Sequence, residues 1–220
     1  MTTIHLAGDS TVAPGPLDGS GVIGWGGVFQ EFVPEPVTNR AIGGATTNSF
    51  QEEGRWAATL EALEPGDFVL IQFGHNDQKE AVLDADGGYA GNLTAFVAQV
   101  RDRGALPVLL TSAERCLFSD EGELRVSHGP YPRAVRRVAH ELDVPLIDLN
   151  VLTRWLYGNA GPQGCEAFFP HLNPGSGNRD TTHFGLLGAR TLASFVAEEL
   201  RAIRGLDDDQ KALGTWDYQA

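Results

Sequence analysis

The first stretch that could do chemistry is Gly8-Asp9-Ser10, which directly follows the short apolar run 4–7. An apolar run with a β-branched residue, broken by glycine, is typical of a strand that ends in a tight turn. Ser10 would then lie at the edge of a sheet, where its hydroxyl could act as a nucleophile. Taken alone, Asp9 and Ser10 fit a helix cap better, because both residue types are favoured at caps. The hypothesis of a nucleophile therefore depends on what the rest of the chain supplies.

A second stretch, Asp180-Thr181-Thr182-His183, could supply the base. Residues three apart on one helical turn lie side by side, so Asp180 could hold one ring nitrogen of His183 while the other nitrogen faces outward. If the fold brings His183 to Ser10, the three residues form a Ser-His-Asp triad. The alternative is a capping Asp180 with a surface His183, and the motif by itself favours neither.

Acyl transfer also requires hydrogen-bond donors for the oxyanion that develops on the substrate. We predict three donors: the backbone N–H groups of Ser10 and Gly44 and the side-chain amide of Asn76. Gly44 lacks a Cβ and so allows close approach of a substrate, although an ordinary turn glycine is the alternative. Asn76 follows a buried apolar run, and functional residues concentrate in loops. Nearby Asp77 is expected to brace the loop. Further candidates for the pocket wall are Asp9, His75 and His128.

Apolar runs of strand length alternate with amphipathic segments along the chain, which predicts a parallel sheet covered by helices on both faces. The fold class is therefore α/β, a three-layer sandwich with five parallel strands, and ligands are expected outside the carboxyl ends of the strands. The expected strands are 4–7, 37–42, 68–73, 106–111 and 145–149. The expected helices are 25–32, 49–63, 90–103, 131–142, 150–157 and 186–203, with an irregular segment at 158–179.

Size and composition limit the class of protein. With 220 residues and 42% hydrophobic content, we expect a single domain over 1–205 and a C-terminal tail over 206–220 that carries Trp216 and Tyr218. The formal net charge of −13 disfavours binding to nucleic acid or to an anionic membrane. No membrane span and no leader peptide are apparent, so a cytoplasmic protein is expected. The two cysteines, Cys116 and Cys165, could meet but are expected to be free thiols, and no metal-ligand spacing is present.

The motifs occur in the order of the four blocks of the SGNH (GDSL-type) hydrolases, which the chain resembles over nearly its whole length. The matching blocks are Gly8-Asp9-Ser10-Thr11, Gly44, Gly74-His75-Asn76-Asp77 and Asp180-Thr181-Thr182-His183. Other stretches resemble the rhamnogalacturonan acetylesterase branch: 24–26, Gly54-Arg55-Trp56, 65–67, 74–79 and 128–132. The resemblance implies a flavodoxin-like sheet, ester hydrolysis without a cofactor or metal, and the roles assigned above to Ser10, Gly44, Asn76, Asp180 and His183.

The chain departs from that branch after the glycine of the second block. Two arginines that the branch carries there are replaced, because this chain has Ala45-Thr46 and then Asn48. Together with the net charge of −13, this argues against a polyanionic substrate unless another arginine lies near the cleft. The arginines considered are Arg40, Arg115, Arg133 and Arg179. We therefore expect an acetylated carbohydrate as substrate and leave the polymer open.

Two further patterns are rejected. The run 19–24 matches the dinucleotide-binding G-x-G-x-x-G pattern but does not directly follow a strand, and no acidic residue stands at 38–44 to hold a ribose. Asn92-Leu93-Thr94 is a glycosylation sequon inside an expected helix.

The sequence thus predicts a serine esterase that deacetylates a carbohydrate through an acetyl-Ser10 intermediate. One alternative is a lipase, lysophospholipase or thioesterase acting on longer acyl chains. The other is a non-catalytic carbohydrate-binding relative.

Overall fold

The computed structural model describes residues 2–15, 20–170 and 180–210, and for 206–210 the backbone only. Five parallel strands form one sheet in the order β2-β1-β3-β4-β5. Their bounds are β1 Ile4–Gly8, β2 Val37–Asn39, β3 Phe68–Gln72, β4 Leu106–Leu110 and β5 Leu146–Ile147. The predicted α/β class and five-stranded parallel sheet are confirmed. The expected tail residues Trp216 and Tyr218 lie outside the described residues.

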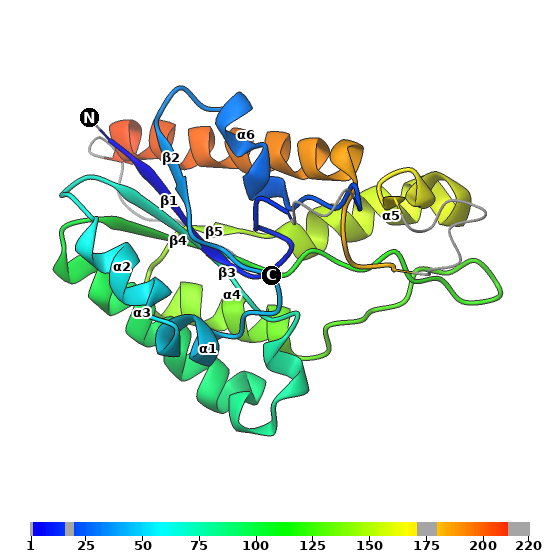
Figure 1. Ribbon diagram of the computed structural model, residues 1–220, viewed down its shortest axis with the longest axis horizontal. Helices are drawn as coiled ribbons and strands as arrows, with labels where there is room; N and C mark the ends of the chain where they lie inside the picture. Colours follow the sequence, from blue (N-terminus) through cyan, green and yellow to red (C-terminus); the bar gives the residue numbers. More distant parts are fainter. Residues whose placement is uncertain (1, 16–19, 171–179, 211–220) are drawn as a thin grey trace.

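Helices cover both faces of the sheet, as Figure 1 shows. On one face lie α1 Thr47–Glu52, α2 Arg55–Glu61, α3 Ala90–Asp102 and α4 Tyr131–Glu141. On the other face lie α5 Leu149–Glu166 and α6 Leu186–Gln210. Each face buries its own apolar cluster, because the strands of a parallel sheet covered on both faces are apolar along their whole length. β3 is apolar from Phe68 to Ile71, and its last residue, Gln72, is buried as well.

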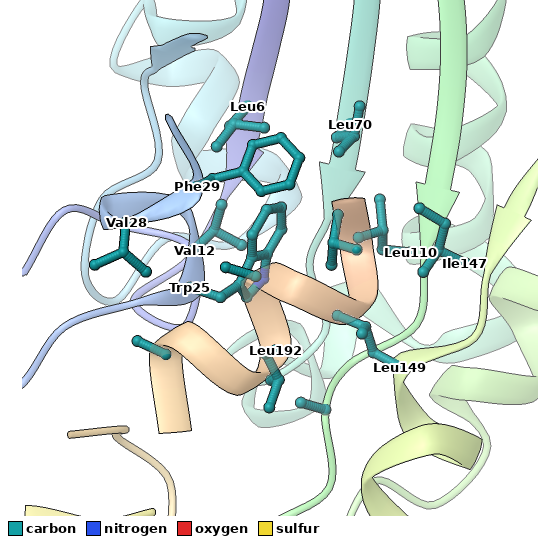
Figure 2. Close-up of a cluster of buried hydrophobic side chains, with 14 of the residues drawn as sticks. Leu6, Val12, Trp25, Val28, Phe29, Leu70, Leu110, Ile147, Leu149 and Leu192 are labelled. Atoms are coloured by element: carbon teal, nitrogen blue, oxygen red, sulfur yellow. The ribbon is translucent and has the colours of Figure 1, made fainter. Parts of the chain in front are cut away.

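Two short 3-10 turns, Trp25–Gly27 and Phe29–Glu31, replace the helix expected at 25–32. The backbone here lies against residues 12 and 13 too closely for side chains: a Cβ added to Gly26 would meet the Val12 carbonyl oxygen at 2.3 Å. Trp25 and Phe29 nevertheless turn inward and pack edge to face at 5.3 Å between ring centroids. Figure 2 shows side chains from β1, β3, β4 and α6 gathered around them. The helix predicted from the apolar spacing was therefore wrong, because the glycines make the segment a pair of turns.

Three other helix predictions were wrong in their bounds. The helix expected at 49–63 is broken into α1 and α2 at Gly54, whose positive φ of 73° ends the first and starts the second. The segment at 158–179 is helical at its start, since α5 continues to Glu166 across a break at Gly161 and Pro162. Residues 171–179, which include His171 and Arg179, lie outside the described residues. Helix α6 runs seven residues past its expected end at 203, to Gln210.

The strand order places β1 between β2 and β3. The chain leaves β1 for β2 on one side and later adds β3 to β5 on the other. A parallel sheet has its ligand crevice at such a reversal, outside the carboxyl ends of the strands. The carboxyl ends of β1, β2 and β3 are directly followed by the segments that carry Ser10, Gly44 and Asn76. The topology therefore gathers the predicted site residues at one edge.

Candidate active site

Ser10 sits on a turn that is fixed by buried hydrogen bonds. The Asp9 carboxylate accepts bonds from the backbone N–H and the hydroxyl of Thr11 at 2.9 and 2.8 Å. The Thr11 hydroxyl in turn accepts a bond from the Gln72 amide at 2.5 Å, and Gln72 accepts one from the Trp25 indole at 2.8 Å. Asp9, Thr11 and Gln72 are almost completely buried, so this network ties the turn to β3 and to the core while Ser10 stays half-buried at the surface.

Ser10, His183 and Asp180 form one hydrogen-bonded chain. The Ser10 hydroxyl lies 2.9 Å from Nε2 of His183, and Nδ1 of His183 lies 2.6 Å from the Asp180 carboxylate. With Nδ1 protonated and donating to Asp180, Nε2 is free to accept the hydroxyl proton of Ser10. Serine and histidine are 173 positions apart in the sequence, so this contact depends entirely on the tertiary fold.

The charges and hydrogen bonds around Ser10, His183 and Asp180 suit His183 to act as a general base. Burial alone would raise the pKa of Asp180, but the hydrogen bonds from the His183 ring and from the N–H groups of Thr182 and His183 outweigh burial and lower it to about 2. The hydrogen bond to Asp180 raises the pKa of His183, against the opposing effect of burial. Asp180 therefore stays ionised at all ordinary pH values and stabilises the protonated ring that forms during proton transfer.

The loop that carries Asp180 and His183 is held by a few contacts. The Arg115 guanidinium donates from Nε to the Thr182 hydroxyl at 3.1 Å, and the Cys116 N–H donates to the Thr181 carbonyl at 3.0 Å. The N–H of Ile23 donates to the Phe184 carbonyl, also at 3.0 Å. Arg115, considered above as a cleft cation, thus supports this loop from the segment after β4.

The predicted oxyanion donors Gly44 and Asn76 also lie at the carboxyl edge of the sheet, after β2 and β3. Gly44 has a positive φ of 81°, and a Cβ added there would meet no atom within 4 Å, so its backbone is exposed toward the solvent side. The Asn76 amide donates one bond to the Ala45 carbonyl at 3.0 Å, while its oxygen accepts one from Lys79 at 2.8 Å. These two contacts fix the orientation of the Asn76 amide and leave its second N–H for a substrate.

Asp77 joins two of the loops, as predicted for a bracing residue. Its carboxylate accepts bonds from the N–H and the hydroxyl of Thr47 at 2.8 and 2.7 Å and from the N–H of Gly74 at 3.0 Å. The start of α1, after β2, is thereby tied to the loop after β3. At the two positions where the related branch carries arginines, Ala45 is buried and Asn48 accepts a bond from the Asn92 amide at 2.8 Å. Between them, Thr46 caps α1 in a reciprocal pair of bonds with Ser49.

Three residues expected in the pocket wall lie beneath it. Asp9, His75 and His128 are 0, 3 and 0% exposed, and none of them is among the described residues that line the cleft at Ser10. Nδ1 of His75 lies 3.3 Å from the Asp9 carboxylate, and the His75 and His128 rings are in contact. Burial, followed by the charges of His75 and Arg115, lowers the pKa of His128 to about 2, so this ring is neutral. Because these three side chains are buried beneath the nucleophile turn, they do not contact the substrate directly.

A cleft of about 690 Å³ opens beside Ser10 and His183 on the β2 side. Its other described lining residues come from 13–15, 20–22, 39–43 and Arg55. Two of the arginines considered from the sequence are engaged elsewhere: Arg40 reaches His5 and Arg133 pairs with Asp86. Arg55 was missed as a cleft residue, although the Gly54-Arg55-Trp56 motif contained it.

The described residues also bear on the expectations about cysteines, metal sites and membrane spans. Cys116 and Cys165 are buried free thiols, and the hydrogen bond between them and burial raise the pKa of Cys165. Cys165 lies within α5, where a loop was expected. Within ranges 2–15, 20–170 and 180–210, no cluster of three or more metal-ligating side chains occurs, and no helix is long and apolar enough to cross a membrane.

A Ser-His-Asp chain at the carboxyl edge of a parallel α/β sheet is the arrangement of a serine hydrolase. The sequence comparison narrows this class: residues 6–190 match the GDSL-like Lipase/Acylhydrolase family, and the chain belongs to that family. The predicted resemblance to SGNH hydrolases is confirmed.

Individual relatives and structures agree with this family. The chain is 42% identical to the rhamnogalacturonan acetylesterase RhgT of Bacillus subtilis over 91% of this chain and 90% of the relative. It is 45% identical to a rhamnogalacturonan acetylesterase of Emericella nidulans, over 87% of this chain and 81% of the relative. The crystal structure of YxiM from Bacillus subtilis superimposes with a TM-score of 0.79 at 29% identity. That match covers 92% of this chain but only 56% of the YxiM chain, so the protein spans about half the length of that structure.

Proposed function

We propose that this protein is a carbohydrate O-acetylesterase that works through an acetyl-serine intermediate. The observation that carries the proposal is the Ser10–His183–Asp180 chain, with distances of 2.9 and 2.6 Å, at the edge of an open cleft. The relatives named as rhamnogalacturonan acetylesterases support the choice of an acetylated saccharide as substrate.

The first half of the reaction transfers the acetyl group to Ser10. Nε2 of His183 takes the hydroxyl proton while Oγ attacks the acetyl carbonyl carbon. The carbonyl oxygen becomes an oxyanion, held by the N–H groups of Ser10 and Gly44 and by the amide of Asn76. The carbon–oxygen bond to the sugar then breaks, and His183 returns its proton to the sugar oxygen, which leaves as an alcohol.

The second half releases acetate. His183 now takes a proton from water, and the resulting hydroxide attacks the acetyl carbonyl of acetyl-Ser10. The same three donors hold the second oxyanion. When the bond to Oγ breaks, His183 gives its proton back to Ser10 and acetate leaves. Asp180 keeps the ring in the tautomer that both halves need.

Acetate release from acetylated pectin, acetylated xylan and acetylated monosaccharides tests the proposal, with Ser10→Ala as the blank. We expect Ser10→Ala to abolish hydrolysis, since removal of a triad serine lowers kcat by about 10⁶-fold. Ser194→Ala is the matched control, because that hydroxyl bonds to a carbonyl of its own helix α6, away from the cleft. Hydrolysis that survives Ser10→Ala would remove Ser10 from the mechanism. Binding of saccharides without any hydrolysis would favour the non-catalytic alternative.

The length of the acyl group is a separate question, because small apolar residues such as Ala13, Val22 and Ile42 line part of the cleft. A comparison of 4-nitrophenyl acetate with the octanoate measures it. We expect the acetate to be preferred, because a long acyl chain needs a continuous apolar wall and the polar side chains of Asn39 and Arg55 also line the cleft. A strong preference for the octanoate would instead support a lipase or thioesterase.

A further inference from the structure

Lys79 contacts the one side-chain amide of the proposed oxyanion hole. Its Nζ group donates to Oδ1 of Asn76 at 2.8 Å, and Nδ2 of the same amide donates to the Ala45 carbonyl at 3.0 Å. The second N–H of Nδ2 is the group that the reaction uses. A positive charge therefore lies on the far side of an amide that is expected to hold the oxyanion.

A short 3-10 turn, Asp77–Lys79, holds the ammonium group beside this amide. The N–H of Lys79 donates to the Asn76 carbonyl at 2.9 Å, so the two residues belong to one turn. The turn is anchored by the buried Asp77 carboxylate, which accepts bonds from Gly74 and Thr47. The Lys79 side chain is exposed, so its bond to Asn76 extends from a fixed backbone into the solvent.

The bond from Lys79 determines which end of the Asn76 amide faces the oxyanion. A half turn of the amide about its last bond would exchange Oδ1 and Nδ2. An NH2 group would then face the Lys79 ammonium, and an oxygen would face the Ala45 carbonyl. Neither pair can form a hydrogen bond, so both contacts would be repulsive. Lys79 and Ala45 together keep an N–H, rather than the oxygen, available to the substrate.

The charge of Lys79 also strengthens the donor that remains. A cation bonded to Oδ1 draws electron density from the amide, and hydrogen bonds in a chain strengthen one another by roughly 10 to 30% each. The positive charge favours the oxyanion over the neutral ester from which it forms. Both effects are larger in the transition state than in the bound substrate, so they raise kcat more than they lower KM.

Lys79 acts on the base as well as on the amide. The hydrogen bond to Asp180 raises the pKa of His183 and burial lowers it; the charges of Asp180 and Asp9 raise it further, and the charge of Lys79 lowers it. Removing Lys79 would therefore raise that pKa. The effect on the oxyanion can be measured separately above the acid limb of the pH profile, where His183 is neutral in every variant.

We infer that Lys79 is a positioning residue of the oxyanion hole, which orients and polarises the Asn76 amide. Lys79 is not among the described residues that line the cleft at Ser10, so it acts through Asn76 and not on the substrate directly. The inference rests on the proposed function and adds a residue to its machinery. It requires that the effect of Lys79 on the reaction depend on the Asn76 side chain.

A double-mutant cycle tests this dependence, with kcat and KM measured on 4-nitrophenyl acetate at a pH above the acid limb. Lys79→Met removes the charge and the donor but keeps an unbranched side chain. We expect it to lower kcat about three- to tenfold with little change in KM, the size of a hydrogen bond from a charged group at the surface. In Asn76→Ala protein, the same substitution should lower kcat no further.

Two more variants separate a local contact from a change of net charge. Lys79→Arg keeps a charged donor, and the exposed position has room for it, so it should recover most of kcat. Arg133→Met removes one positive charge at an exposed position that pairs with Asp86, away from the cleft, and its kcat should equal that of the wild type. Urea unfolding of each variant confirms that the proteins compared are folded.

The outcomes are distinct. A fall in kcat in Lys79→Met that disappears in Asn76→Ala protein, and is reversed in Lys79→Arg, supports the positioning role. An unchanged kcat in Lys79→Met, an equal fall in Arg133→Met, no recovery in Lys79→Arg, or the same loss with and without the Asn76 side chain would overturn it. The proposed function fails differently: the wild type would then hydrolyse the ester no faster than Ser10→Ala.

Discussion

The nucleophile and the base are held in contrasting ways. The turn of Ser10 is flanked by Asp9 and Thr11, which are 0 and 1% exposed and belong to a buried polar network. The side chains of Asp180 and His183 are 21 and 34% exposed, and their loop is attached by single bonds from Ile23, Arg115 and Cys116. Buried hydrogen bonds are costly to break, whereas bonds at the surface can be replaced by water. We therefore expect changes in the two regions to affect different properties.

After Ser10→Ala itself, the largest effect is expected on the base side, from Asp180→Asn. The asparagine amide can donate an N–H to Nδ1 and so favour the wrong tautomer, and it carries no charge to stabilise the protonated ring, so kcat should fall by about 10⁴-fold. The free energy of unfolding should change little, because the loop is partly exposed. Kinetics with 4-nitrophenyl acetate and urea unfolding measure both. A fall of less than tenfold in kcat would mean that Asp180 does not orient His183.

Asn76→Ala tests the oxyanion donors and should lower kcat by about 10²- to 10³-fold with little change in KM. We expect kcat to change more than KM because the Asn76 amide interacts mainly with the charge that develops in the transition state. Asn48→Ala is a suitable control, because Asn48 bonds to Asn92 through its side chain and is only half-buried. If kcat is unaffected in Asn76→Ala, the residue has only its structural bond to Ala45.

Two threonines test the comparison directly. Thr11→Val leaves a buried donor of Gln72 unpaired, so we expect a loss of about 1 to 3 kcal/mol in the free energy of unfolding. Thr182→Val removes only the acceptor of the Arg115 bond on a half-buried loop, and should lower kcat about tenfold with a stability change below about 1 kcal/mol. Thr191→Val on helix α6 is the control for the substitution itself. Equal losses of stability in both variants would contradict the contrast between the regions.

The smallest effect concerns pH. His183 must be neutral to accept a proton, and its hydrogen bond to Asp180 raises its pKa above the ordinary value of 6.5. Activity should therefore fall as pH drops through that raised pKa, with the midpoint of the acid limb somewhat above 6.5. Asp180, with a pKa of about 2, adds no second limb in this range. The pH profile of kcat/KM on 4-nitrophenyl acetate checks this, and a flat profile from about pH 5 to 8 with chemistry rate-limiting would exclude His183 as the base.

Local sequence patterns determined the fold class and named the residues that meet at Ser10. Apolar runs fix strands because they are buried on both faces, and residues such as Asp180 and His183 signal chemistry through their short-range spacing. The helix predictions at 25–32 and 49–63 failed for the same reason. In both segments the apolar residues have helical spacing, but glycines interrupt the helix. The helical residues beyond Gly158 were missed because glycine and proline predict the end of a helix. Gly161 and Pro162 do break α5, but the helix resumes after the break and continues to Glu166.

Tertiary structure alone decided which polar residues face the cleft. The sequence made His75 and His128 candidates for the pocket wall, but packing buries both beneath the nucleophile turn. Arg55 reaches the cleft because the break at Gly54 and the bond to the Arg40 carbonyl direct it there. Residue type and spacing act over a few positions and can be found in the sequence. Burial and orientation depend on contacts between distant segments, such as the bond between Ser10 and His183, and these exist only once the chain has folded.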